Sequence, residues 1–240
     1  MEKFKKIAAR AEKRKGGAAE LKRLLPQGVS KKTLATTADD RFLAMMTKCI
    51  NQAGFSWKVI EKKWPQFEEA FFKFDLYKLS LLSPEQWENY VKDTRVVRNW
   101  QKIKAVKENV AFIQQEAREH GSFAQFIAEW PCDNLVGLFS YLKKHGSRLG
   151  GNTGQRFLRY VGKDTFILSQ DVIATLQQAG LDIADNPTSK RDLGKIQQAF
   201  NLWHDETGLS YTHLSKIASY AIGQNYDNDT IRREILKTSN

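Results

Sequence analysis

The stretch that decides the fold is Leu149–Leu176, LGGNTGQRFLRYVGKDTFILSQDVIATL. Its pattern indicates a helix, a glycine-rich hairpin, a second helix, and a short connection to a further helix. Gly150, Gly151 and Gly154 are expected in one turn, because glycine permits left-handed backbone and close approach of another surface. A turn of this kind, opening onto a helix N-terminus, points backbone N–H groups outward and can bind a phosphate.

Asp171 is the candidate for chemistry in this stretch. It follows Gly154 by seventeen positions, in the run Ser169-Gln170-Asp171. The residues alone also allow a structural role, because Ser169 is a good N-cap and an acidic residue in the first turn is favoured by the helix dipole. Both roles stay open at this point.

Composition indicates a globular chain with a sizeable core. Of the 240 residues, 41% are hydrophobic and 27% are charged. No run of about 18 apolar residues is present, so no membrane span is expected. The first residues are charged, unlike a signal peptide, and the two cysteines suggest no disulfide framework. We expect a monomer located in the cytoplasm and associated with the nucleoid.

The positive charge is concentrated near the N-terminus. The formal net charge is +11, and residues 1–32 hold eleven Lys and Arg against three Glu. A solvated basic tail would explain this, but we favour a helical arm that adds nonspecific contacts to a polyanion. The expected domains are therefore a basic arm over 1–32 and a main domain over 33–240, which can comprise two helical lobes.

Helical periodicity runs through almost every segment, and no strand-like alternation is sustained. We therefore expect an all-α fold of about ten helices. Gly54 and Ser56 predict the end of one helix and the N-cap of the next. The Ser83-Pro84-Glu85-Gln86 sequence predicts a helix start with a capping box.

A second stretch carries a family resemblance. Gln52-Ala53-Gly54-Phe55-Ser56-Trp57 is similar to the Gln-Ala-Gly-Leu-Ser-Trp segment of the DNA-3-methyladenine glycosylase I family. The Lys102-Ile103-Lys104-Ala105 segment and Asn109 also match that family's pattern. The chain thus resembles the helix-hairpin-helix DNA glycosylases, in which the hairpin grips the DNA backbone and an Asp downstream serves the chemistry. The Lys163-Asp164-Thr165-Phe166 run is similar to the one that precedes the catalytic Asp in alkylpurine-excising members.

The sequence departs from the family at three points. Cys49 stands where the family has a base-contacting Glu. The family's zinc-binding segments are missing, and the four His and two Cys show no ligand spacing, so we expect no metal and no cofactor. Gln155 occupies the position where bifunctional relatives place a Schiff-base Lys, which implies no strand cleavage.

The resemblance implies a monofunctional DNA repair glycosylase that flips out and excises alkylated purines such as 3-methyladenine from double-stranded DNA. It implies that Asp171 stabilises the oxocarbenium-like sugar. Base contacts are expected from Cys49, Gln52, Phe55 and Trp57, although Trp57 could equally be a core residue and Gln52 a plain helix-end residue. DNA contacts are expected from the hairpin: Gly150, Gly151, Asn152, Thr153, Gly154 and Gln155.

Two other functions fit part of the sequence. A noncatalytic helix-hairpin-helix protein that binds damaged or distorted DNA would explain the loss of the Glu and of the zinc segments. A basic RNA-associated helical protein would explain the charge. The presence of Asp171 argues against the first, and the hairpin–Asp spacing is unexplained by the second.

Overall fold

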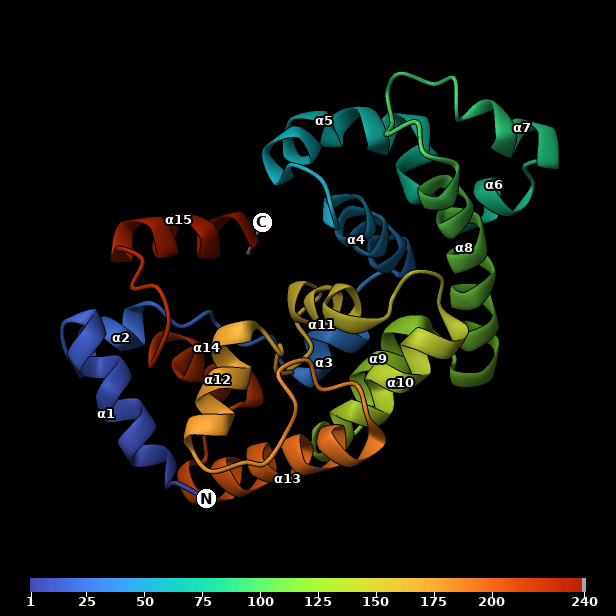
Figure 1. Cartoon of the computed structure of the whole chain (residues 1–240). Coiled ribbons are helices and arrows are strands. Elements are labelled where there is room, and N and C mark those ends of the chain that lie inside the picture. Colours follow the sequence, from blue (N-terminus) through green and yellow to red (C-terminus); the bar gives the residue numbers. More distant parts are fainter. Residues whose placement is uncertain (239–240) are drawn as a thin grey trace. The chain divides into compact units, whose positions relative to one another are not determined.

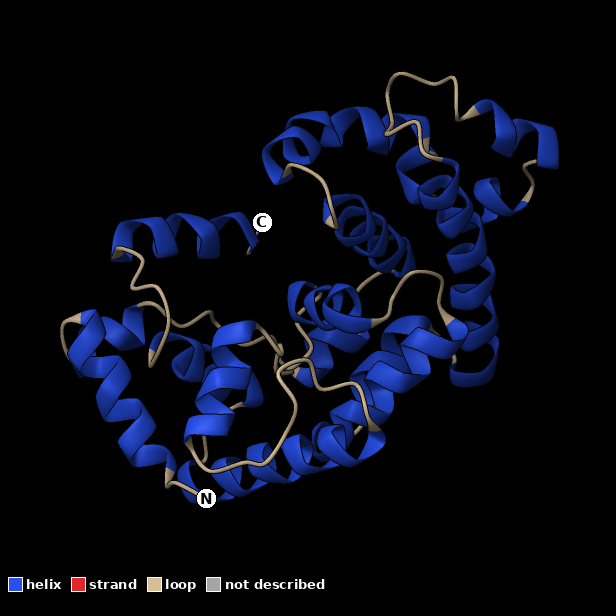
Figure 2. Cartoon of the chain, viewed as in Figure 1, coloured by secondary structure: helices blue, strands red, loops and turns tan. Residues whose placement is uncertain are grey.

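The computed structural model describes residues 1–238, and every regular element within that range is a helix (Figure 2). The expected all-α fold class is therefore confirmed. None of the described helices combines the length and the apolar character needed to cross a bilayer.

The chain divides into two compact units. Unit 1 comprises residues 1–29, residues 131–137, and the chain from residue 158 onward. Unit 2 comprises residues 30–130 and 138–157. The chain therefore enters unit 2 twice, and helices α10 and α11 each contribute residues to both units. Figure 1 labels these helices along the chain.

Local sequence signals set the helix ends in unit 2. The Ser83 hydroxyl accepts a hydrogen bond from the Gln86 N–H at 3.2 Å, and the Gln86 side chain accepts one from the Ser83 N–H at 2.8 Å, which confirms the capping box. Gly121 ends the longest helix with a φ of +85°. The helices of unit 2 are α3 (Lys31–Ala35), α4 (Asp39–Gln52), α5 (Trp57–Ala70), η1 (Phe72–Phe74), α6 (Leu76–Ser80), α7 (Pro84–Asn89), α8 (Trp100–His120), α9 (Phe123–Glu129), most of α10 (Leu135–His145) and the first part of α11 (Gly151–Tyr160).

Aromatic side chains form the core of unit 2. Phe42 on α4 makes edge contacts with Phe123 and Phe157, at centroid distances of 5.4 and 6.3 Å. All three rings are almost completely buried. Because each such ring removes a large apolar area from water, these contacts fix α4, α9 and α11 against one another.

Aromatic side chains lie in the core of unit 1 as well. Phe166 stacks on Phe200 at 4.3 Å, and Phe4 contacts Trp203 at 5.3 Å. The helices of unit 1 are α1 (Phe4–Lys15), α2 (Ala18–Arg23), η2 (Cys132–Asn134), α12 (Gln170–Gln178), α13 (Lys190–Thr207), α14 (Tyr211–Tyr220), α15 (Asn228–Thr238), and the remaining residues of α10 and α11.

The first 29 residues are packed inside unit 1, which differs from the separate arm expected over 1–32. Phe4, Ile7 and Ala11 are buried on one face of α1. Lys15, one of the basic residues, is itself buried and donates hydrogen bonds to Asn225 and to the Tyr226 carbonyl. Phe4, Ile7 and Ala11 recur at helical spacing, but the sequence prediction did not recognise them as a buried face, because residues 1–29 also hold nine Lys and Arg.

Candidate nucleic-acid interface

Two aromatic side chains are exposed where α4 gives way to α5. Gly54, between the helices, has a left-handed φ of +69°, and Ser56 is the N-cap of α5. The turn leaves Phe55 and Trp57 46% and 41% exposed. Trp57 is therefore not the core residue that the sequence also allowed. Two large exposed rings within three residues of the sequence suggest a binding surface.

Both rings lie under cations from other helices of unit 2. The Arg156 guanidinium on α11 is 5.0 Å from the centre of the Trp57 ring. The Lys102 ammonium on α8 is 5.7 Å from the centre of the Phe55 ring. These distances are within the range at which a cation is attracted to an aromatic face. Trp57 is thus linked to α11, the helix that follows the hairpin, and Phe55 to α8.

Lys102 also closes the C-terminal end of α4. Its ammonium donates hydrogen bonds to the carbonyl oxygens of Asn51 and Ala53, at 2.9 and 3.0 Å. A cation at a helix C-terminus pairs with carbonyls that have no partner inside the helix. Burial lowers the pKa of Lys102, and the charge of Arg148 lowers it further. Lys102, the first residue of the family-like Lys102–Ala105 segment, therefore has a structural role next to Phe55.

The other two expected base-contacting residues are buried at the end of α4. The Gln52 amide donates a hydrogen bond to Glu61 at 3.1 Å, and the second Glu61 oxygen is 3.0 Å from Lys48. The hydrogen bond to Glu61 thus fixes the orientation of the Gln52 side chain, which a residue that only ends a helix would not require. Burial raises the pKa of the Cys49 thiol to about 12, although the charges of Arg156 and Lys48 act in the opposite direction. Cys49 is therefore uncharged at neutral pH and unreactive as a nucleophile.

The expected helix-hairpin-helix arrangement is present as α10, a turn over residues 146–150, and α11. Asn109 on α8 fixes this turn from the inside. Its amide donates to the Ser147 carbonyl at 3.1 Å and its oxygen accepts from the Ser147 N–H at 2.8 Å. Asn109 is completely buried. The Asn that matched the family pattern thus serves to position the hairpin.

The glycines are distributed differently from the expectation of one turn. Gly150 ends the turn, whereas Gly151 begins α11 with a φ of +56°. Gly154 is already inside the helix and is needed for close packing, because an added Cβ would lie 2.2 Å from the Leu149 carbonyl oxygen. The remaining hairpin residues expected to contact DNA are also helical: Asn152, Thr153 and Gln155.

The first two residues of α11 lie at the surface. Gly151 and Asn152 are exposed, Thr153 is half-buried and Gln155 is buried. The first N–H groups of any helix have no partner inside it and carry the positive end of the helix dipole. This end of α11 can therefore accept a phosphate.

Asp171 belongs to unit 1, whereas Phe55 and Trp57 belong to unit 2. It is the second residue of α12, and Ser169 is the N-cap, its hydroxyl accepting from the Val172 N–H at 3.3 Å. Capping is thus performed by Ser169 and does not require the Asp171 carboxylate. Asp171 is half-buried against Gly223, where an added Cβ would lie 2.0 Å from a carboxylate oxygen.

The N-terminal helix holds the segment against which Asp171 packs. The Arg14 guanidinium donates to the carbonyl oxygens of Tyr220 at 2.9 Å and Gly223 at 2.6 Å. Gly223 has a left-handed φ of +72°. Arg14 therefore stabilises a turn that only glycine can form next to Asp171.

The run before Asp171 is structural. The Asp164 carboxylate accepts hydrogen bonds from the N–H groups of Tyr211 and Thr212, at 3.1 and 2.8 Å, and so caps α14. Phe166 is buried in the ring stack of unit 1. These residues place α12, and with it Asp171, on the body of unit 1.

A known protein family matches the part of the chain that carries the exposed rings of Phe55 and Trp57. Residues 33–138 match the methyladenine glycosylase family. This range contains Cys49, Gln52, Phe55 and Trp57, whereas the hairpin turn and Asp171 follow it. The match confirms the resemblance that the Gln52–Trp57 segment indicated.

One curated relative agrees with this result. DNA-3-methyladenine glycosylase 1 of Escherichia coli (strain K12) is 35% identical over 76 residues, which are 32% of this chain and 41% of that protein. The chain thus matches about two fifths of the length of this curated relative. A 3-methyladenine DNA glycosylase I from Staphylococcus aureus has a TM-score of 0.49 and 19% identity, covering 69% of this chain and 88% of its own.

The fold is shared over most of the chain with a more distant protein. The 8-oxoguanine glycosylase/lyase of Methanocaldococcus jannaschii, whose structure is a complex with DNA, has a TM-score of 0.51 and 14% identity. It covers 89% of this chain and 95% of its own. This similarity shows a common helical fold, including the C-terminal half that the family match leaves out.

Sequence reasoning did not find three residues that shape these sites. Arg156, Glu61 and Arg14 hold Trp57, Gln52 and the Gly223 turn, respectively. Arg156 directly follows the hairpin residue Gln155, so its position next to a helix N-terminus was the available signal. Glu61 and Arg14 are ordinary charged helix residues in the sequence, and only the tertiary contacts distinguish them.

Proposed function

We propose that this protein is a DNA N-glycosylase that excises alkylated purines, such as 3-methyladenine, from double-stranded DNA. The observation that supports this most directly is the methyladenine glycosylase match over residues 33–138, because that range carries the exposed Phe55 and Trp57. The fold shared with a DNA glycosylase/lyase adds support for the remainder of the chain.

In this proposal the hairpin binds the DNA backbone. The N–H groups at the start of α11 would receive a phosphate, and Gly150, Gly151, Asn152 and Thr153 would line the contact. Phosphate contacts fix the register of a protein on DNA without reading its sequence. Such contacts suit an enzyme that searches any sequence for a damaged base.

Base recognition would take place on the aromatic surface. A flipped purine would stack on Trp57 or Phe55, on the ring face that the neighbouring cation leaves free. The Gln52 amide, which Glu61 orients, would hydrogen-bond the base edge. Cys49 would contribute shape rather than charge, because its thiol is neutral.

Asp171 would serve the chemical step. Hydrolysis breaks the bond between C1′ and the base nitrogen, and positive charge develops on the sugar before water adds to C1′. A carboxylate beneath the sugar stabilises that charge and accepts a proton from the attacking water. One carboxylate suffices for an N3- or N7-alkylated purine, which leaves as a neutral base. Gln155 offers an amide in place of an amine, so no Schiff base forms and the enzyme is monofunctional.

Base release from alkylated DNA tests the proposal. Methylated genomic DNA is incubated with the protein, and the released bases are separated and identified. We expect methylated purines in the supernatant and abasic sites that persist in the DNA without strand cleavage. Release of no base by a folded protein that still binds the DNA would contradict the proposal.

Binding of methylated DNA without release of any base would support the alternative function, a noncatalytic protein that binds damaged DNA. The neutral Cys49 at the place of the family Glu is the feature that favours this second function. Preferential binding of methylated over unmodified duplex, without base release, is the result that it predicts.

A further inference from the structure

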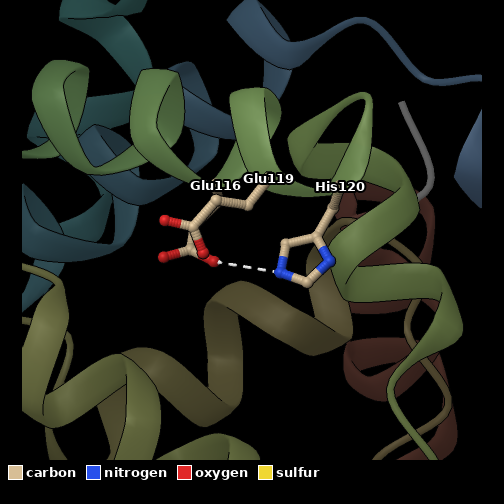
Figure 3. Close-up of side chains that lie close together, drawn as sticks. All are labelled: Glu116, Glu119 and His120. Carbon is tan, nitrogen blue, oxygen red and sulfur yellow. Dashed lines mark ion pairs between the residues drawn. The ribbon is translucent and has the colours of Figure 1, made fainter.

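Three potential metal ligands meet on one face at the end of α8. Glu119 and His120 follow Glu116 by three and four positions, spacings that bring each of them to the same side of the helix as Glu116. One ligand atom from each residue lies within 4.8 Å of the others. Figure 3 shows the two carboxylates and the imidazole turned toward one another.

Glu116 is the unusual member of this cluster, because its side chain is only 1% exposed. One of its oxygens accepts a hydrogen bond from the Tyr141 hydroxyl at 2.8 Å. The other oxygen, Oε2, is buried without a hydrogen bond and lies 3.6 Å from the Nε2 atom of His120. A buried carboxylate is costly unless a cation or donors compensate it. This oxygen is therefore available to a cation at the cluster.

We propose that Glu116, Glu119 and His120 bind a divalent first-row transition-metal ion, with Zn²⁺ as the first probe. One imidazole nitrogen and two carboxylate oxygens suit such an ion, whereas Mg²⁺ prefers oxygen ligands alone. Around an ion bound at about 2.1 Å, tetrahedral ligand atoms are about 3.4 Å apart. Glu119 and His120 are exposed, so small rotations of their side chains close the remaining gap.

The surroundings of Glu116 fit a metal ligand. Carboxylates that bind metals are usually oriented by a hydrogen bond to their second oxygen, and Tyr141 supplies one. His120 is the last residue of α8, where the helix dipole favours a cation.

The site differs from the metal arrangement considered in the sequence analysis. The expectation of no metal was based on the spacing of His and Cys alone, and this cluster uses two carboxylates. Its residues belong to unit 2 and include none of the residues proposed to contact DNA. The bound ion would stabilise the end of α8 against Tyr141 of α10.

Calorimetric titration of the chelator-treated, untagged protein with Zn²⁺ tests this inference. We expect one equivalent of Zn²⁺ to bind and to raise the melting temperature. Glu116→Gln keeps the size and the hydrogen bond from Tyr141 but removes the charge. It and His120→Asn should each weaken Zn²⁺ binding at least about tenfold, since loss of supporting residues alone has effects of this size. Mg²⁺ should not compete.

Matched controls separate this site from general surface binding. Glu88→Gln and Glu129→Gln each remove an exposed carboxylate outside the cluster, and should bind Zn²⁺ as the unaltered protein does. Glu119→Gln and His120→Asn alter exposed side chains and should leave the protein folded. If Glu116→Gln unfolds, the Zn²⁺ affinities of these two variants test the site instead. Absence of Zn²⁺ binding to the unaltered protein, or equal affinity in the cluster variants, would overturn the inference and leave a Glu116–His120 ion pair.

Discussion

Asn109→Leu should loosen the hairpin while leaving most of unit 2 folded. Asn109 is completely buried, and both of its polar groups are bonded to Ser147. Each hydrogen bond contributes about 1 kcal/mol net, and the Ser147 N–H and carbonyl would lose their partners. Because Ser147 is half-buried, water can reach these groups in part. We therefore expect the free energy of unfolding to fall by about 2–3 kcal/mol.

The assay combines urea denaturation with hydrogen exchange. Denaturation gives the total loss of stability, while exchange of the amides in residues 146–151 reports whether the hairpin opens locally. Affinity for a short DNA duplex, measured by fluorescence anisotropy, should fall in parallel because the N–H groups at the start of α11 lose their fixed position. Gln101→Leu, an exposed position on the same helix, is the control and should change stability by less than about 0.5 kcal/mol.

Two results would refute this reasoning. Stability equal to that of the unaltered protein would mean that the two hydrogen bonds do not hold the turn. Faster exchange throughout unit 2, without preference for residues 146–151, would mean that Asn109 supports the whole core rather than the hairpin.

Three further changes test the proposed DNA contacts and chemistry. Asp171→Asn should reduce base release by about 10² or more and preserve DNA affinity; a first-turn role alone predicts a loss of only about 0.3–1 kcal/mol of stability and full activity. Gly151→Asp should weaken DNA binding more than Gly151→Asn, because both side chains tolerate the left-handed φ but only Asp repels phosphate; equal affinities would remove the hairpin from the interface. Lys13→Gln combined with Lys22→Gln should lower the slope of log affinity against log salt by about 0.9 for each phosphate that the variant no longer neutralises. The melting temperature should not change, since both side chains are exposed. An unchanged slope would show that these lysines of α1 and α2 do not touch DNA.

Sequence reasoning was most accurate where the signal is local. The capping box at Ser83 and the helix end at Gly54 depend on neighbours within four residues, and both were predicted. The hairpin was located to within one turn, but its glycines could not be divided between turn and helix. Gly154 follows Leu149 by five residues, and its need for glycine comes from packing against the Leu149 carbonyl, which no propensity encodes.

Residues that act through distant partners could not be predicted in this way. Lys15 belongs to a strongly basic segment, yet it is buried by contacts with Asn225 and Tyr226, about 210 positions away. The net charge of a segment indicates that most of its side chains are exposed, but it does not indicate which face of its helix packs against the core. The same limitation applies to Glu116, whose burial distinguishes it from the exposed Glu119 three positions later.

The charges around Cys49 bear on which bases the proposed enzyme would accept. A carboxylate at that position would attract a cationic alkylpurine, but the Cys49 thiol is neutral, and Arg156 and Lys48 add positive charge nearby. Glu61 pairs with Lys48, so the charge of Arg156 remains, directed at the face of Trp57. A cationic base would therefore gain less binding free energy from this surface than from one that holds a carboxylate, while the affinity for a neutral base would not be reduced. We expect discrimination by shape and stacking on Trp57 to matter more here than attraction of charge, because stacking on an aromatic ring is available to any purine.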